Sequence, residues 1–342
     1  MLKTKRIFFW TAAFLFSTLA CRAVTSLIIP DTPTAPPPPT FTPLPPPTAT
    51  STATVEANAS CPLLLDDIMD AATSFGGNEE ARDERYLVTY SVAGDTIHDP
   101  QYETVPVDLK DEQDDLAAQK SIWNYFTSII PPEQRDLIAE YSIITDGKEN
   151  ILAAVSQTYN DPSLWALEVD IADSDDYYNL TFTLIHEFGH LLTLNPSQVP
   201  PSIEVFNNPD DDVIYQNAVA SCPDYFSGEG CSNPASYINA FYQRFWPEIH
   251  DEWQQIDSIE NEDVYYEKLN EFYDQYEDQF VTDYAVTNPG EDIAESWSFF
   301  VLSPKPEGNS IADQKVLFFY DYPELVDLRQ KILNRLCISF PQ

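Results

Sequence analysis

The chain has 342 residues, and its 56 acidic side chains against 17 basic ones give a formal net charge of −39. Binding to nucleic acid or to anionic lipid depends on clustered cationic side chains, so this charge excludes an ordinary nucleic-acid-binding protein. Residues 60–342, which follow an export segment and a proline-rich tract, are enough for one large domain with a sizeable core.

Residues 1–21 are typical of a signal peptide. Basic side chains precede an apolar run from Ile7 to Leu19 that is short for a transmembrane helix, and a small residue follows at Ala20. Thr18-Leu19-Ala20-Cys21 is similar to the box that ends lipoprotein signals, in which the cysteine receives the lipid. Ordinary signal cleavage nearby is the alternative. Both outcomes predict an extracellular or cell-surface protein, and a lipid on Cys21 would be its only membrane contact.

Proline, threonine, alanine and serine dominate residues 22–59. Such a composition lacks the apolar periodicity of a packed element and favours extended chain. We therefore expect a disordered stalk that holds the domain at residues 60–342 away from the membrane.

Four cysteines remain beyond Cys21, an even number that predicts disulfides in an oxidising compartment. Pairing of Cys222 with Cys231 would close a short loop, and pairing of Cys61 with Cys337 would join the two ends of the domain. Four cysteines allow three connectivities, of which this is one. A zinc cluster is the alternative, but the sequence contains no C-x-x-C pair.

The domain is predicted to belong to the α+β class, with a small sheet in a first lobe, residues 60–195. Extended segments are expected at 86–90 and 104–107, helices at 111–130 and 132–140, and strands at 141–145, 151–157 and 164–170. A longer helix, from about 176 to 194, is capped by Asp173 or Ser174. Residues 196–342 form a mostly helical second lobe, with helices at 234–258, 262–279, 290–302 and 322–336.

The helix at 176–194 contains His186-Glu187-Phe188-Gly189-His190. Histidines four residues apart lie on one face of a helix, so both imidazoles can bind one Zn²⁺ without backbone strain. Glu187 would take a proton from water bound to the metal. The helix is apolar nearly all round, and polar side chains in a buried helix are costly unless something pairs with them. A metal is the simplest partner; core histidines satisfied by hydrogen bonds are the alternative.

A catalytic zinc site needs a third protein ligand and an open position. The candidates are His98, His250 and the downstream carboxylates, and the best segment is Tyr284 to Trp297. A helix starts there at Glu291, which would bind zinc, and Glu295 one turn later would orient a ligating histidine. Solvated glutamates at a helix N-terminus are the alternative.

The motif at 186–190, followed by Glu291-x-x-x-Glu295, resembles the glutamate zincins (gluzincins). Within them it is most similar to the catalytic domain of anthrax lethal factor and to zinc-binding metallopeptidases of bacterial secreted proteins. The resemblance covers the two motifs and little between them, and the separation of the motifs is longer than usual, which implies an insertion.

The resemblance implies a zincin-like fold with Glu291 as the third ligand and Glu295 in support. It also implies that Tyr284 is the phenol that stabilises the oxyanion or protonates the leaving amine. In zincins the edge strand beside the metal helix pairs with extended substrate, and residues 166–169 are expected to be that strand.

Together these features predict a monomeric, secreted or surface-anchored zinc metalloendopeptidase that acts on protein or peptide substrates with Glu187 as the base. A surface binding module with zinc but no turnover is the alternative from another class, although a structural zinc has no need for Glu187. A hydrolase of cell-wall amides is the enzymatic alternative, and the sequence does not separate it from a peptidase.

Overall fold

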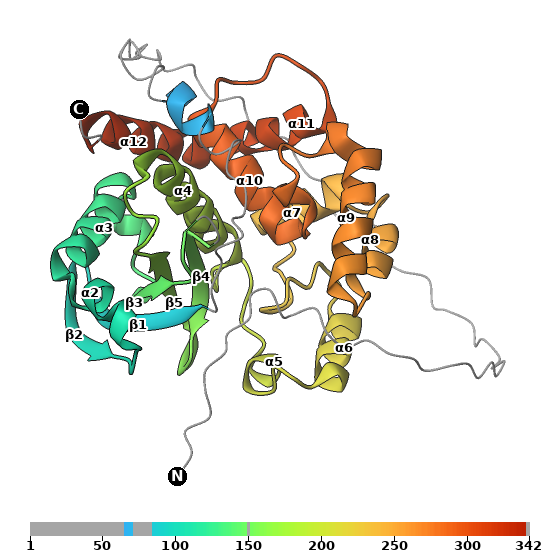
Figure 1. Ribbon diagram of the computed structural model, residues 1–342. Helices are drawn as coiled ribbons and strands as arrows, with labels where there is room; N and C mark the ends of the chain where they lie inside the picture. Colours follow the sequence, from blue (N-terminus) through green and yellow to red (C-terminus); the bar gives the residue numbers. More distant parts are fainter. Residues whose placement is uncertain (1–64, 71–83, 149–150, 340–342) are drawn as a thin grey trace, which may run out of the picture.

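Figure 1 shows the computed structural model of the chain, which describes residues 65–70, 84–148 and 151–339. The expected signal peptide, the stalk and the Cys61–Cys337 disulfide lie outside the described part of the chain. Within that part, no helix has both the length and the apolar composition needed to cross a membrane. A disulfide joins Cys222 to Cys231, which confirms that pairing.

Five strands, all between residues 85 and 170, form a mixed sheet with the order β2-β1-β3-β5-β4 in the described residues. They are β1 (Arg85–Ala93), β2 (Thr96–Tyr102), β3 (Ile138–Thr145), β4 (Ala153–Thr158) and β5 (Asp161–Asp170). β3 and β5 run parallel, whereas the other neighbours are antiparallel. The central strands are buried along most of their length, because their apolar side chains are covered on both faces of the sheet.

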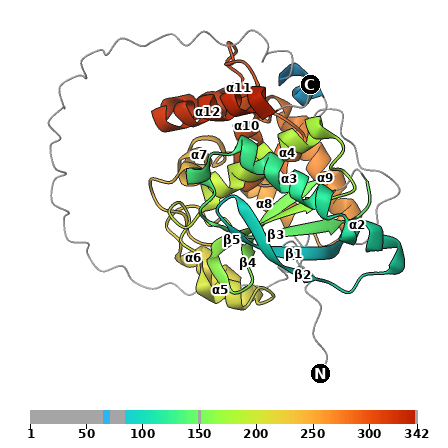
Figure 2. The same cartoon turned by 90° about the vertical axis from the view of Figure 1, so that its left-hand side faces the viewer.

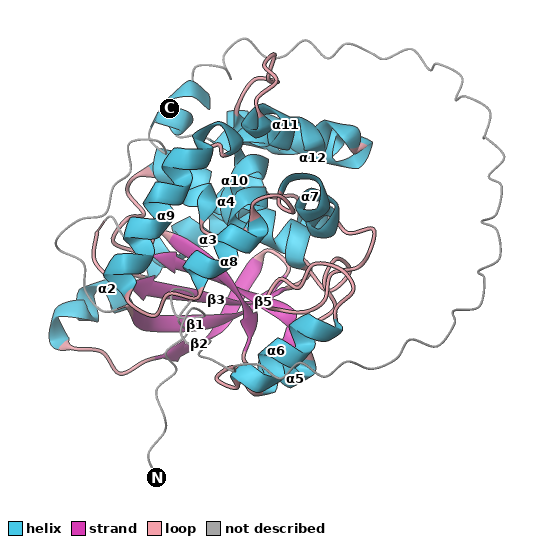
Figure 3. Ribbon diagram, turned by 90° about the vertical axis from the view of Figure 1, so that its right-hand side faces the viewer, coloured by secondary structure: helices cyan, strands magenta, loops and turns pink. Residues whose placement is uncertain are grey.

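Two of the helices named here lie between β2 and β3 in the sequence, and the others follow β5. These helices are α2 (Lys110–Asp114), α3 (Leu116–Ile129), α4 (Tyr177–Leu194), α5 (Ile203–Asn207), α6 (Asp212–Ser221), α7 (Tyr237–Phe245), α8 (His250–Asp257), α9 (Glu262–Tyr276), α10 (Pro289–Leu302), α11 (Ile311–Phe318) and α12 (Pro323–Ser339). α3, α4, α10 and α12 lie on the same side of the sheet (Figures 2 and 3). α4 contacts β4, α10 packs on α4, and α12 returns to α3. This architecture confirms the α+β class.

The predicted helix at 132–140 is wrong. Only Pro132–Gln134 forms a 3-10 turn, and β3 begins at Ile138. The residues of β3 pair with β1 on one side and β5 on the other, so sheet formation overrides the local helical preference of this segment.

Residues 104–107 do not form a strand, although Pro106 has extended dihedrals, and the unbroken helix at 234–258 is wrong. β1 pairs with β3 on one side and with β2 on the other. A tight turn at Gly94 and Asp95 brings β2 alongside β1, and Gly94 has the positive φ of 61° that such a turn requires. Pro247 cannot continue a helix, so the later segment divides into α7 and α8.

The expectation that residues 166–169 form an edge strand is wrong as well. These residues belong to β5, which lies between β3 and β4, and β4 is the strand at this edge of the sheet. Leu167 and Val169 are fully buried, which is the environment of an interior strand.

The helices α4 and α10 pack closely because Gly189 has no side chain. A Cβ at Gly189 would lie 3.0 Å from Cδ1 of Trp297 and 3.1 Å from Cα of Ala294. Asp176, rather than Asp173 or Ser174, caps α4 by accepting a hydrogen bond from a backbone N–H of the first turn. The close approach decides which side chains of α4 and α10 can meet.

Replacement of Gly189 with Ala therefore pushes α10 away from α4. We expect Gly189→Ala to lower the free energy of unfolding by about 1–3 kcal/mol, the usual effect of overpacking a tight core. Urea denaturation measures this change. Thr183→Ala, at a half-buried position of the same helix, is the control and changes stability much less. Equal stability of the two variants would show that the crossing tolerates a methyl group.

Candidate metal centre

Side chains from α4 and α10 converge where the two helices pack together. His186, Glu187 and His190 come from α4, and Glu291 and Glu295 come from the first two turns of α10. All five are buried, with 3–7% of their surface exposed. The group on α4 and the group on α10 lie more than 100 residues apart in the chain, so only the packing of these two helices brings them together.

Three ligand atoms form a compact triangle. Nε2 of His186 lies 3.1 Å from Nε2 of His190, and Oε2 of Glu291 lies 3.0 Å and 3.2 Å from these two nitrogens. Zinc–ligand bonds of roughly 2.0–2.1 Å at tetrahedral angles separate neighbouring ligand atoms by about 3.3 Å. The triangle therefore has the size and the donor types of three zinc ligands.

The second ring nitrogen of His186 supports the same conclusion. Its Nδ1 lies 2.7 Å from Oε1 of Glu295, so Nδ1–H donates to this carboxylate and a neutral ring presents the lone pair of Nε2 to Glu291. A lone pair and a carboxylate oxygen repel each other unless a proton or a cation lies between them. A zinc ion would satisfy both groups, and Glu295 would then hold a ligating histidine in place.

Without a metal, protons take over this role. Burial alone would lower the pKa of His186, but hydrogen bonds to Glu291 and Glu295 raise it well above its ordinary value. Burial likewise opposes ionisation of Glu291, yet the neighbouring histidines hold its pKa well below the usual range. The cluster thus favours positive charge at its centre.

Glu187 faces the same centre without taking a ligand position in the triangle. One of its carboxylate oxygens lies within 4.8 Å of a ring nitrogen of each histidine. The backbone N–H of Val155, on the edge strand β4, donates to its carboxylate, and burial raises the pKa of Glu187 to about 7. A carboxylate with a pKa near neutrality can accept a proton and pass it on.

Tyr284 and Thr282 complete the surroundings. Tyr284, in the 3-10 turn before α10, has its ring centroid 5.8 Å from that of His186, and 53% of its surface is exposed. The nearby charge of Glu291 raises the pKa of Tyr284 well above its ordinary value, so its phenol remains a proton donor. Thr282 donates a hydrogen bond of 2.6 Å to Oε2 of Glu295 and fixes the carboxylate that holds His186.

A buried ion pair holds the start of α10. Nζ of Lys315 lies 2.6 Å from Oδ2 of Asp292, both side chains are fully buried, and Nε1 of Trp246 donates to the same oxygen at 2.8 Å. The ammonium group also lies 3.9 Å from the centroid of the Phe280 ring. Since Asp292 follows Glu291 directly, this anchor fixes the helical turn that carries the proposed third ligand.

The other two candidate ligands lie elsewhere. His98 is exposed on β2 and contacts Asp99, and His250 packs among Tyr242, Trp246 and Trp253. Neither belongs to the cluster. Of the three candidate classes for the third ligand, the structure brings a downstream carboxylate to the two histidines.

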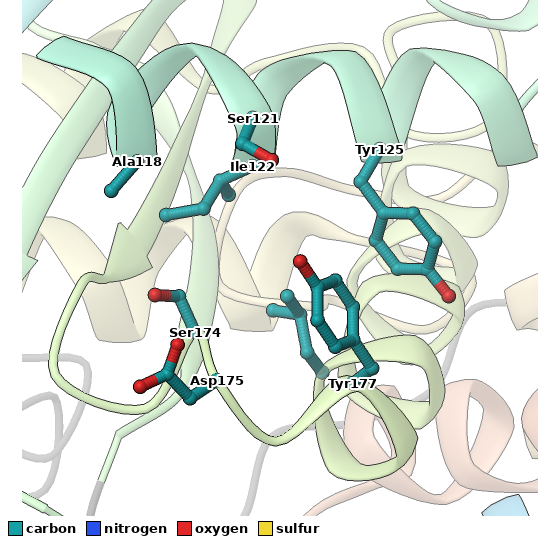
Figure 4. Close-up of a pocket in the computed structure, with 8 residues that line it drawn as sticks. Ala118, Ser121, Ile122, Tyr125, Ser174, Asp175 and Tyr177 are labelled. Atoms are coloured by element: carbon teal, nitrogen blue, oxygen red, sulfur yellow. The ribbon is translucent and has the colours of Figure 1, made fainter. Parts of the chain in front are cut away.

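A separate hollow lies between α3 and the start of α4 (Figure 4). Its walls include Ser121 and Tyr125 on one side and Ser174, Asp175 and Tyr177 on the other. It contains one carboxylate and no histidine or cysteine, so it lacks the set of donors that a zinc site needs. The cluster on α4 and α10 is the stronger candidate.

The sequence did not identify four further residues that act on this centre or on the helix turn that carries Glu291. Thr282 gives no pattern of its own, and the pairing of Asp292 with Lys315 depends on the packing of α11 against α10. Glu229, whose carboxylate interacts electrostatically with His190 and Glu291, lies between two glycines in the disulfide-closed loop. The Gly-Glu-Gly sequence is the one signal that could have indicated Glu229.

Comparisons with protein-family models, with curated proteins and with solved structures found no match.

Removal of the ammonium group at Lys315 leaves a buried carboxylate without its partner. We expect Lys315→Met to lower the free energy of unfolding by about 3–5 kcal/mol, and a second change, Asp292→Asn, to recover most of this loss. Urea denaturation of the single and double variants measures both. Lys268→Met is the control, because its pair with Glu271 is exposed and screened by water. A loss no larger than that of the control would refute the anchor.

Proposed function

We propose that the chain is an exported zinc metallopeptidase with a zincin-like active site. The observation that carries this proposal is the triangle of His186, His190 and Glu291, with Glu187 beside it and Glu295 behind it. The Cys222–Cys231 disulfide is consistent with an oxidising compartment, and the N-terminal sequence predicts export, with a lipid on Cys21 as the anchor.

Each residue has a role that follows from its position. Zinc, when bound, supplies a Lewis acid that lowers the pKa of water and polarises a carbonyl oxygen. Glu187 accepts the proton of the attacking water and donates it to the leaving amine, because its carboxylate faces the centre and its pKa lies near neutrality. Tyr284 donates a hydrogen bond to the oxyanion from the open side of the site. Glu295 and Thr282 keep the His186 ring in place.

The edge strand β4 supports a peptide as the substrate. It is antiparallel to β5, no described strand pairs with its outer edge, and Val155 on it donates to Glu187. An extended peptide can add to a free edge through backbone hydrogen bonds. A peptide on β4 would therefore run past Glu187 and the metal ligands.

Zinc content and four variants test this proposal. We expect about one tightly bound zinc per chain, lost in His186→Ala. Glu187→Gln retains the zinc and lowers turnover of unfolded protein substrates by roughly 10²–10⁴-fold, the range for loss of a general base. Glu291→Ala lowers zinc affinity more than Glu295→Ala does, since loss of a supporting carboxylate costs about 10- to 100-fold.

Three results would contradict it. Unchanged turnover in Glu187→Gln would remove this residue as the base. A larger loss of zinc in Glu295→Ala than in Glu291→Ala would exchange their roles. Tight zinc without cleavage of unfolded proteins or cell-wall fragments would favour a surface binding module with a structural metal.

Zinc uptake should also release protons. The raised pKa values of His186 and His190 keep protons in the metal-free cluster, and zinc must displace them. Affinity therefore falls as the pH falls, and proton release persists above pH 7, where an ordinary imidazole of pKa about 6.5 is mostly neutral. Isothermal titration calorimetry in buffers of different ionisation enthalpy measures it. Glu295→Gln, which removes one source of the shift, lowers the release at pH 7.5.

A further inference from the structure

A short hairpin carries Glu229, whose charge interacts with His190 and Glu291. We call residues 226–231 the Glu229 hairpin: Phe226 and Cys231 pair as an antiparallel bridge, and Gly228 has a positive φ of 100°. The disulfide between Cys222 and Cys231 closes its base. The loop is short and cross-linked, so the position of Glu229 is well defined.

The neighbouring chain fixes the hairpin further. The carbonyl of Glu229 accepts a hydrogen bond of 2.7 Å from the N–H of Ser202. A Cβ on Gly230 would lie 2.1 Å from the carbonyl oxygen of Pro200, so only glycine allows this approach. The segment that leaves α4 and the hairpin therefore move as one unit.

The carboxylate of Glu229 is half-buried and has no cationic partner among the described residues. Ser227 donates a hydrogen bond of 2.6 Å to it, and no described lysine or arginine lies within ion-pair distance. Burial raises the pKa of Glu229, and the charge of Glu291 acts in the same direction, while Ser227 and His190 oppose the shift. A carboxylate in such a place gains free energy when a cation joins it.

Aromatic rings pack on and beside the hairpin that carries this carboxylate. Tyr215 of α6 contacts Phe226 of the hairpin edge to face, and Tyr225 stacks on Tyr242 with 4.5 Å between ring centroids. Glu229 interacts electrostatically with Tyr215 and Tyr225. Aromatic faces beside a carboxylate favour ammonium and guanidinium groups.

A zinc ion in the proposed centre would not neutralise the charge of Glu229. The two charges of Zn²⁺ would be balanced by the carboxylates of Glu187 and Glu291, so Glu229 remains an additional anion at the site. Glu229 interacts electrostatically with His190 and Glu291, so its charge acts on the proposed metal centre.

We propose that Glu229 selects substrates by binding one of their cationic groups, a lysine or arginine side chain or a terminal amine. This proposal deepens the peptidase function and rests on it for the position of the substrate. The fixed hairpin, the unpaired carboxylate and the tyrosine rings carry it.

Paired peptides test the selection directly. The probes are decapeptides in which one lysine, or norleucine of the same length, moves through successive positions, with the N-terminus acetylated or free. Their affinity is measured by fluorescence anisotropy with the full, zinc-loaded chain carrying Glu187→Gln, and kcat/KM is measured with Glu187 intact. We expect the lysine peptide to bind roughly 10- to 100-fold more tightly than its norleucine partner at one position, as for a hydrogen-bonded charge.

The variant Glu229→Gln should abolish this preference and retain one zinc per chain. The control Glu204→Gln, an exposed acidic residue of α5, should keep both the preference and the zinc. If acetylation of the N-terminus removes the preference, the cation is the terminal amine; if the preference follows the lysine, it is the side chain.

Binding and cleavage separate the two proposals. Equal affinity for paired peptides, absence of binding by both, or a preference that survives Glu229→Gln would overturn the role of Glu229, even if peptides are cleaved. A preference lost in Glu229→Gln, without cleavage of any peptide by the intact chain, would retain the cation site and refute the peptidase.

Discussion

The close packing of α10 on α4 is the contact on which the rest of this structure depends. Gly189 lets the two helices approach until Ala294 and Trp297 touch the α4 backbone region that carries the histidines. His186 and His190 lie one turn apart on α4, and Glu291 and Glu295 lie one turn apart on α10. Two helical repeats in contact therefore place four side chains at one point without any special loop.

Charge is concentrated at this contact to an unusual degree for a protein interior. Glu291 and Asp292 lie in the first turn of α10, where the helix dipole favours anions, and each has a different partner. Asp292 meets a lysine on the side away from the cluster, whereas Glu291 meets the histidines. One turn of helix thus has one carboxylate neutralised by the protein and one that remains for a ligand.

Much of the site could be predicted from the sequence, because its parts are local patterns. The four-residue spacing on α4 and the four-residue spacing on α10 depend only on helix geometry, and the structure brings them together. Strand order was another matter. Residues 166–169 belong to the strand that precedes α4 in the sequence, yet β4 is at the edge of the sheet. The local sequence does not show that β5 pairs with β3, because the two strands are separated in the chain by β4.

The errors in the fold have the same origin. Residues 132–140 contain a proline start and good helix formers, but pairing with β1 and β5 draws Ile138 onwards into the sheet. Glu229 and Lys315 could not be linked to the site from the sequence, since neither has a fixed separation from the metal motif. The spacing of residues within one helix does not predict contacts that depend on which helices pack together.

The sequence separation of 105 between His186 and Glu291 also sets an order of events during synthesis. A chain that has been made only as far as α4 contains both histidines and Glu187, but none of the carboxylates of α10. The proposed catalytic centre therefore cannot assemble until nearly the whole chain is available to fold. A chain that is exported before it folds would therefore have no assembled centre in the cytoplasm and could not cleave the proteins of the cell that makes it.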